Sequence, residues 1–174
     1  MDYHTSYANN SNALLLIDIQ DVYFTPGPML LNKPIETANK AAALLERFRN
    51  EGKTVIHIQH DSKLLSGINK RVKPINGEKI INKKFPSSFL KTDFQEYLQA
   101  NGVEHIVIAG MMSHMCVDTT TRACQDYGYE VTVIEDACTT KSLNFKGKTI
   151  PAQIVHEVFM ASLKGNGKLL SYIK

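Results

Sequence analysis

Apolar runs typical of buried strands alternate along this chain with segments whose apolar residues recur every three or four positions. The strand-like runs are 13–18, 54–59, 105–110, 129–136 and 168–173. The helix-like segments are 35–52, 92–102, the stretch that begins at Cys116, and 150–165. Nearly continuous apolar strands separated by helices favour a parallel sheet covered on both faces. The pattern therefore predicts an α/β fold.

Small and polar residues mark the ends of the predicted helices. Gly52 and Gly102 are well placed to end the first and second helices, because glycine readily adopts the left-handed conformation that follows a helix. Thr92 and Gln95 have the spacing of a capping box, which predicts that the second helix begins at Thr92.

The segment 60–88 has little periodicity apart from the strand-like EKIINKK. Long structureless loops in compact domains are usually functional. We interpret this segment as a lid-like loop, a short strand and a turn that delivers Lys83.

Composition narrows the range of functions. The 174 residues, 43% of them hydrophobic, are enough for one domain spanning 1–174, with residues 1–11 expected to be a flexible N-terminus. A net charge of +3, with dispersed basic residues, gives little support to nucleic-acid binding. The chain begins without a signal-peptide pattern and no apolar run is long enough to span a membrane, so we expect a soluble, cytoplasmic protein that does not bind membranes.

Sequence motifs give no sign of a cofactor. No GxGxxG follows the first strand, and the GNGK near the C-terminus precedes a strand, so no nucleotide cofactor is predicted. Three irregularly spaced cysteines form neither a zinc pattern nor a disulfide framework, and we expect free thiols.

Cys116 is the candidate nucleophile. It follows the strand-like run 105–110 at the predicted start of a helix, where unpaired N–H groups and the helix dipole are expected to lower the pKa of a thiol. Asp18 and either Lys83 or Lys84 also lie at the ends of predicted strands, which share one edge in a parallel sheet. Each residue also has a simpler interpretation. Cys116 could be a small buried side chain, Asp18 a turn cap at the end of a strand, and the lysine a solvated surface charge. Cys138 is a rival nucleophile near the same edge.

Four segments in order resemble the isochorismatase-like cysteine hydrolases over nearly the whole chain. They are ALLLIDIQDVYF, VIHIQHDS, NKKFPSSFLKTDF and GMMSHMCVDTTTRACQDYGYEVTVIEDAC. The turn and the HDS region are similar to streptothricin hydrolases in the amidase branch, which also includes relatives of the nicotinamidases. The resemblance implies a six-stranded, mostly parallel Rossmann-like sheet in three layers, an Asp-Lys-Cys catalytic triad, and a homo-oligomer, either a dimer or a tetramer.

The resemblance assigns the triad to Asp18, Lys83 and Cys116. The family's lysine stands six residues before the phenylalanine of a Ser-Phe pair, and counting back from Phe89 reaches Lys83. Lys84 is the alternative, but neighbouring residues of a strand point to opposite faces, so only one of the two can enter the site.

The nucleophile turn is the source of the expected oxyanion hole. We expect the backbone N–H groups of Met112 and Cys116 to form it. The resemblance also implies a cis peptide bond at Met111–Met112.

The expected reaction is hydrolysis of a C–N bond in a small amide or lactam through a thioester intermediate. Residues that could line the substrate pocket are Tyr23, Phe24, His60, Ser113 and His114, although packing and turn formation would also account for them. No metal site is expected, because HIQHDS lacks the Asp-x-His pattern of metal-binding relatives and His57 and His60 point to opposite faces of a strand.

Two other kinds of protein fit the same fold. One is a catalytically silent protein that keeps the fold for assembly, since fold alone does not establish activity. The other is a thiol redox or regulatory protein in which Cys116 is oxidised, although the chain has no CxxC pair.

Overall fold

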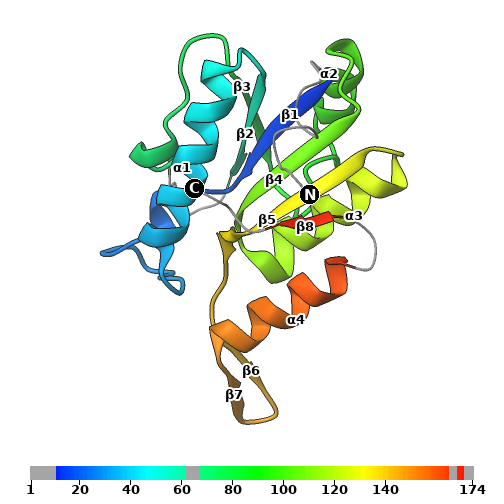
Figure 1. The fold of residues 1–174 in the computed structure, drawn as a ribbon. Helices are drawn as coiled ribbons and strands as arrows, with labels where there is room; N and C mark the ends of the chain where they lie inside the picture. The colour runs from blue at the N-terminus through cyan, green and yellow to red at the C-terminus, as the bar shows by residue number, and fades with distance from the viewer. Residues whose placement is uncertain (1–10, 62–66, 165–167, 171–174) are drawn as a thin grey trace.

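A six-stranded, fully parallel sheet forms the centre of the protein in a computed structural model, which describes residues 11–61, 67–164 and 168–170 (Figure 1). The strands, in the spatial order β3-β2-β1-β4-β5-β8, are β1 Asn12–Ile17, β2 Thr54–His60, β3 Lys79–Lys83, β4 His105–Met111, β5 Glu130–Thr139 and β8 Lys168–Leu170. This arrangement confirms the predicted α/β sheet. Of the expected flexible N-terminus, 1–11, residues 1–10 lie outside the described residues.

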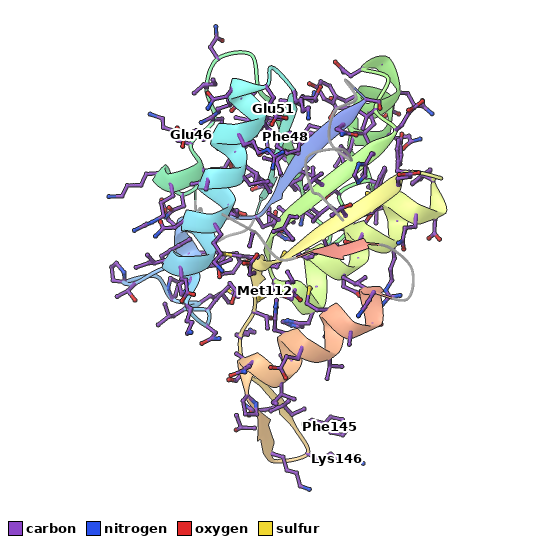
Figure 2. The ribbon with its side chains drawn as sticks, viewed as in Figure 1. Glu46, Phe48, Glu51, Met112, Phe145 and Lys146 are labelled. Carbon is purple, nitrogen blue, oxygen red and sulfur yellow. The ribbon has the colours of Figure 1, made fainter. Side chains whose placement is uncertain are left out.

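Four α-helices cover the sheet: α1 Pro34–Asn50, α2 Phe94–Ala100, α3 Asp118–Asp126 and α4 Ala152–Lys164. Side chains of β1 alternate between two separate cores, because neighbouring strand residues point to opposite faces. Leu14 packs with α1 residues, including Phe48 (labelled in Figure 2), whereas Leu15 packs with residues of α2, α3 and α4. The predicted coverage of both faces is confirmed. Among the described residues, no helix is long and apolar enough to cross a membrane.

The predicted capping box at Thr92 and Gln95 is wrong. Helix α2 begins two residues later, at Phe94, and its N-cap residue Asp93 makes no side-chain capping hydrogen bond. The Thr92 hydroxyl instead donates to the Ser88 carbonyl at 2.5 Å and accepts from the Phe94 N–H at 3.3 Å. Thr92 therefore fixes the turn that leads into the helix.

A two-stranded antiparallel hairpin, β6 Leu143–Phe145 and β7 Lys148–Ile150, is a further element that the sequence analysis did not predict. It projects away from the sheet and leads directly into α4 (Figure 1). Phe145 and Lys146 lie at its tip, with Phe145 exposed (Figure 2). Three-residue strands are too short to give a clear alternating pattern, so only the Lys146–Gly147 turn could have indicated them.

Segment 60–88 contains the expected short strand, β3, and a 3-10 turn, η2 Lys70–Val72. Glu78 anchors the approach to β3 through hydrogen bonds from the Arg49 guanidinium at 2.7 and 2.8 Å, the Ile75 N–H at 3.0 Å, and His57 Nε2 at 2.9 Å. Burial alone would raise the pKa of Glu78, but these partners outweigh it and lower the pKa to about 2. The proposed lid stays a prediction, and residues 62–66 of it lie outside the described residues.

Candidate active site

Three parallel strands deliver the triad candidates to one edge of the sheet. Asp18 follows β1, Lys83 is the last residue of β3, and Cys116 lies in a π-helical turn, η3 Ser113–Val117, that follows β4. Gly110 near the end of β4 allows β1 and β4 to approach closely: it has φ 148°, and a Cβ atom there would lie 2.1 Å from the Ile17 carbonyl oxygen. Glycine at this position therefore helps to bring Asp18 beside the nucleophile turn.

The Lys83 ammonium lies at the centre of the site. Its Nζ is 2.7 Å from Asp18 Oδ2, 3.2 Å from Cys116 Sγ, 3.1 Å from His60 Nδ1 and 3.2 Å from the Phe85 carbonyl oxygen. Asp18, Lys83 and Cys116 are all buried, with exposed fractions of 0%, 1% and 4%. The structure thus brings the three predicted residues together.

The choice between the two neighbouring lysines is resolved by their orientation. Lys84 points to the opposite side of β3, where its side chain is 76% exposed and lies 3.9 Å from Asp61. Lys83 is therefore the lysine that enters the site.

Asp18 has the environment of a proton acceptor. It adopts the left-handed conformation, φ 50°, which aspartate and asparagine tolerate better than most residues. Its buried Oδ1 atom has no hydrogen-bond partner among the residues that the structure describes, while Oδ2 is held by Lys83. Burial raises the pKa of the Asp18 carboxyl, and the Lys83 ammonium opposes that rise. One carboxylate oxygen therefore remains available for a proton.

The expected low pKa of Cys116 is wrong. The residue lies inside η3 rather than at the start of an α-helix, since α3 begins only at Asp118. Burial and the Asp18 carboxylate raise the pKa of the thiol to about 12, and Lys83 offsets only part of that rise. Cys116 therefore rests as a thiol, and a partner must remove its proton during reaction.

Asp18, His60 and Cys116 also form a set of possible metal ligands, because their ligand atoms all lie within 4.8 Å of one another. The Lys83 ammonium, however, contacts all three and occupies the place that a cation would take. These residues fit an internal ammonium better than a metal ion. His57, the other histidine of β2, is buried against Glu78.

The aromatic residues proposed for the pocket are both buried. Tyr23 and Phe24 belong to the core that packs under α1. Burial raises the pKa of Tyr23, and the negative charge of Asp18 adds to the rise. The Phe24 ring is 6.0 Å from the Arg71 guanidinium carbon.

Ser113 and His114 are directed toward elements behind the nucleophile turn. Ser113 Oγ lies 2.8 Å from Nδ1 of His156 on α4, and Ser113 is fully buried. His114 Nδ1 is hydrogen-bonded to the Thr140 hydroxyl, and its ring meets Phe159 edge-on at 5.9 Å. The sequence analysis did not single out His156, because its spacing on α4 gives no sign of a contact with a turn 43 residues away.

The peptide bond Met111–Met112 is cis, as the resemblance implies. Met112 (labelled in Figure 2) follows β4, and its carbonyl accepts hydrogen bonds from Met115 N–H at 3.0 Å and Val117 N–H at 3.3 Å. These bonds tie Met112 to η3, the turn that contains Cys116.

All three cysteines are free, as expected. Cys138 lies within β5 and lines a pocket of about 160 Å³ that also contains the Lys40–Asp136 ion pair. Burial raises the pKa of the Cys138 thiol to about 12, and no lysine among its electrostatic partners offsets this. This environment gives Cys138 less support as a nucleophile than Cys116 has.

Comparisons with known proteins agree with the fold and with the motifs. The family model described as "Isochorismatase domain" matches residues 12–150. YddQ of Bacillus subtilis, an uncharacterized isochorismatase family protein, is 43% identical over 169 residues, covering 89% of this chain and 92% of YddQ. A streptothricin hydrolase of Streptomyces noursei is 28% identical over 137 residues, covering 74% of this chain and 49% of that protein. The crystal structure of an isochorismatase from Pseudomonas putida superposes with a TM-score of 0.88 at 32% identity, covering 93% of this chain and 88% of that one.

Proposed function

The chain belongs to the isochorismatase family, and from this we propose that it is a cysteine-dependent hydrolase that cleaves the C–N bond of a small amide or lactam. The observation that carries the proposal is the contact of one buried ammonium, Lys83 Nζ, with both the Asp18 carboxylate and the Cys116 thiol. Burying a carboxylate and an ammonium costs free energy unless the two charges are paired. Clusters of buried ionisable groups with shifted pKa values occur at active sites.

In the proposed reaction Asp18 Oδ1 takes the thiol proton as Cys116 Sγ attacks the carbonyl carbon. The Sγ–C bond forms, and the carbonyl oxygen becomes negative in a tetrahedral intermediate. Backbone N–H groups of Met112 and Cys116 would stabilise that oxygen; a donor of this kind contributes about 3 to 4 kcal/mol in comparable sites.

Collapse of the intermediate breaks the C–N bond. The nitrogen leaves with the proton held by Asp18, which gives an amine or ammonia and a thioester on Cys116. Water then attacks the thioester, giving its proton to Asp18, and the acid departs as the proton returns to sulfur. Lys83 keeps the carboxylate charged at the start of each step by opposing its raised pKa.

The substrate side of the proposal rests on two neutral side chains. His60 Nδ1 lies 3.1 Å from Lys83 Nζ, and burial followed by the Lys83 charge lowers the pKa of His60, so the imidazole is neutral at pH 7. Burial and the Asp18 charge raise the pKa of Tyr23, so its phenol is neutral as well. A neutral wall beside one internal cation suits an uncharged carboxamide or lactam. The relation to a streptothricin hydrolase supports the lactam alternative.

The homo-oligomer stays a prediction, which sedimentation equilibrium would test.

The test is a screen of small carboxamides and lactams, including streptothricin, nicotinamide and maleamate, for release of amine or ammonia or for ring opening. Acid quenching followed by peptide mass spectrometry should find an acyl group on Cys116. Cys116→Ala should abolish both signals, whereas Cys124→Ala, which alters another buried thiol, should leave them in place. Turnover that persists in Cys116→Ala would contradict the mechanism.

A further inference from the structure

The nucleophile turn has a second set of polar contacts that the proposed chemistry does not use. Ser113, the first residue of η3, has no exposed surface, and its hydroxyl lies 2.8 Å from Nδ1 of His156. His156 belongs to α4, which packs against η3 and against α3. A side chain of α4 thus reaches the nucleophile turn, which Lys83 contacts through Cys116.

We propose that His156 is a positioning residue, acting through Ser113, that holds the backbone of the nucleophile turn in the geometry needed to stabilise an oxyanion. This inference rests on the proposed function, because it assigns a role within the same acyl-transfer site. It does not require His156 to touch the substrate.

The chemistry of the pair fits a fixed hydrogen bond. Burial lowers the pKa of His156, so the imidazole is neutral at pH 7 and one ring nitrogen can accept. The Ser113 hydroxyl then donates to Nδ1, with the imidazole proton assigned to Nε2. Loss of His156 leaves the buried Ser113 hydroxyl without this partner, which costs about 1 to 3 kcal/mol and favours a rearranged turn.

The π-helical turn η3 is an uncommon backbone conformation that the Ser113–His156 hydrogen bond would stabilise. A π-helical turn is rare and usually occurs as a single turn at a functional site. Ser113 directly follows Met112, and the proposed oxyanion donors stand on either side of Ser113, at Met112 and Cys116. Donors of this kind act only when they lie about 2.7–3.1 Å from the developing charge, so a small shift of Ser113 would misdirect both.

Two electrophiles separate this role from a purely structural one. p-Nitrophenyl acetate acylates a thiol through a tetrahedral intermediate, whereas iodoacetamide alkylates it by direct displacement without an oxyanion. His156→Ala should slow burst acylation of Cys116 by p-nitrophenyl acetate about 10- to 100-fold, yet change the iodoacetamide rate less than about 2-fold. Val158→Ala, which alters an exposed residue of the same helix, should change neither rate.

Variants at Ser113 make the test independent of any folding defect in His156→Ala. Ser113→Ala should reproduce the selective loss of acylation, and the double variant should be no slower than either single variant, because both remove one hydrogen bond. Ser113→Thr keeps the hydroxyl and should retain most of the acylation rate.

The inference and the proposed function fail in different ways. If the wild type is acylated at Cys116 but the variants lose both reactions equally, or lose neither, His156 has no positioning role and only this inference is overturned. If wild type and Cys116→Ala react alike with p-nitrophenyl acetate, there is no acyl-transfer site, and both proposals are overturned.

Discussion

Replacing Asp18 by asparagine should make the Cys116 thiol more acidic while it abolishes turnover. The substitution removes one negative charge, preserves the shape of the side chain, and suits the left-handed backbone at this position, φ 50°. Burial is the main reason for the thiol pKa of about 12, and the Asp18 charge is the next. Lys83 keeps hydrogen bonds to His60 and to the Phe85 carbonyl, so a cation remains beside the sulfur.

The size of the effect follows from the separation of the groups. Ligand atoms of Asp18 and Cys116 lie within 4.8 Å of each other. With an effective dielectric constant of about 20, two charges at that distance interact by about 3.5 kcal/mol, which corresponds to a thiol pKa lower by about 2.5. The thiolate fraction then rises about 300-fold, but a less basic thiolate is a weaker nucleophile, so we expect alkylation to become about 20-fold faster.

The assay is the rate of iodoacetamide alkylation of Cys116 between pH 6 and 10, followed by mass spectrometry, beside turnover of any amide found in the screen. Turnover of Asp18→Asn should fall at least about 100-fold, because a positioned general base contributes a factor of that order. Asp61→Asn, which alters an exposed carboxylate near Lys84, should change neither rate. Alkylation that is unchanged or slower in Asp18→Asn would refute the electrostatic argument.

Lys83→Met should destabilise the protein by about 3–5 kcal/mol in urea unfolding at pH 7, because it leaves Asp18 buried without its cation, whereas Lys84→Met should change stability by less than about 0.5 kcal/mol. The pKa of Asp18 is raised in the folded protein, so the charged carboxylate lowers the free energy of unfolding as pH rises. Because Asp18 is protonated at acidic pH, the stability lost in Lys83→Met should become smaller there. Gly110→Ala would force a methyl group against the backbone of β1, and calorimetry should show a loss of about 3 kcal/mol or more. Glu78→Gln should lower the free energy of unfolding by about 1–3 kcal/mol in urea titrations. Since the Glu78 pKa is lowered from 4.5 to about 2, this difference from wild type should be constant above pH 4.5 and become smaller below it.

The positions of Asp18, Lys83 and Cys116 could be predicted because each depends on a long-range rule and not on local detail. The carboxyl ends of parallel strands lie at the same edge of a sheet. Three polar residues that each follow an apolar strand are therefore expected at that edge. Alternation along a strand meant that only one of Lys83 and Lys84 could enter the site, and the family resemblance assigned that place to Lys83. The parallel sheet and its helices on both faces followed from the apolar pattern, whereas the count of six strands was implied by the family resemblance.

The local details that were missed depend on partners far apart in the chain. Thr92 has capping-box spacing with Gln95, but Ser88 offers its hydroxyl a better acceptor, and α2 begins later. His156 has no periodic signature of its contact with Ser113. Hairpin β6–β7 has strands of three residues, too few for an alternating pattern to be recognised.

The environment of Cys116 also argues against a redox role. A sensor cysteine is exposed and has a low pKa, because the thiolate is the form that oxidants attack. Cys116 is 4% exposed, and burial raises its pKa to about 12, so the thiol is the predominant form at pH 7. A hydrolase can use such a thiol because Asp18 Oδ1 can take its proton during the attack. Between attacks the same burial keeps the sulfur protonated and protects it from adventitious oxidation.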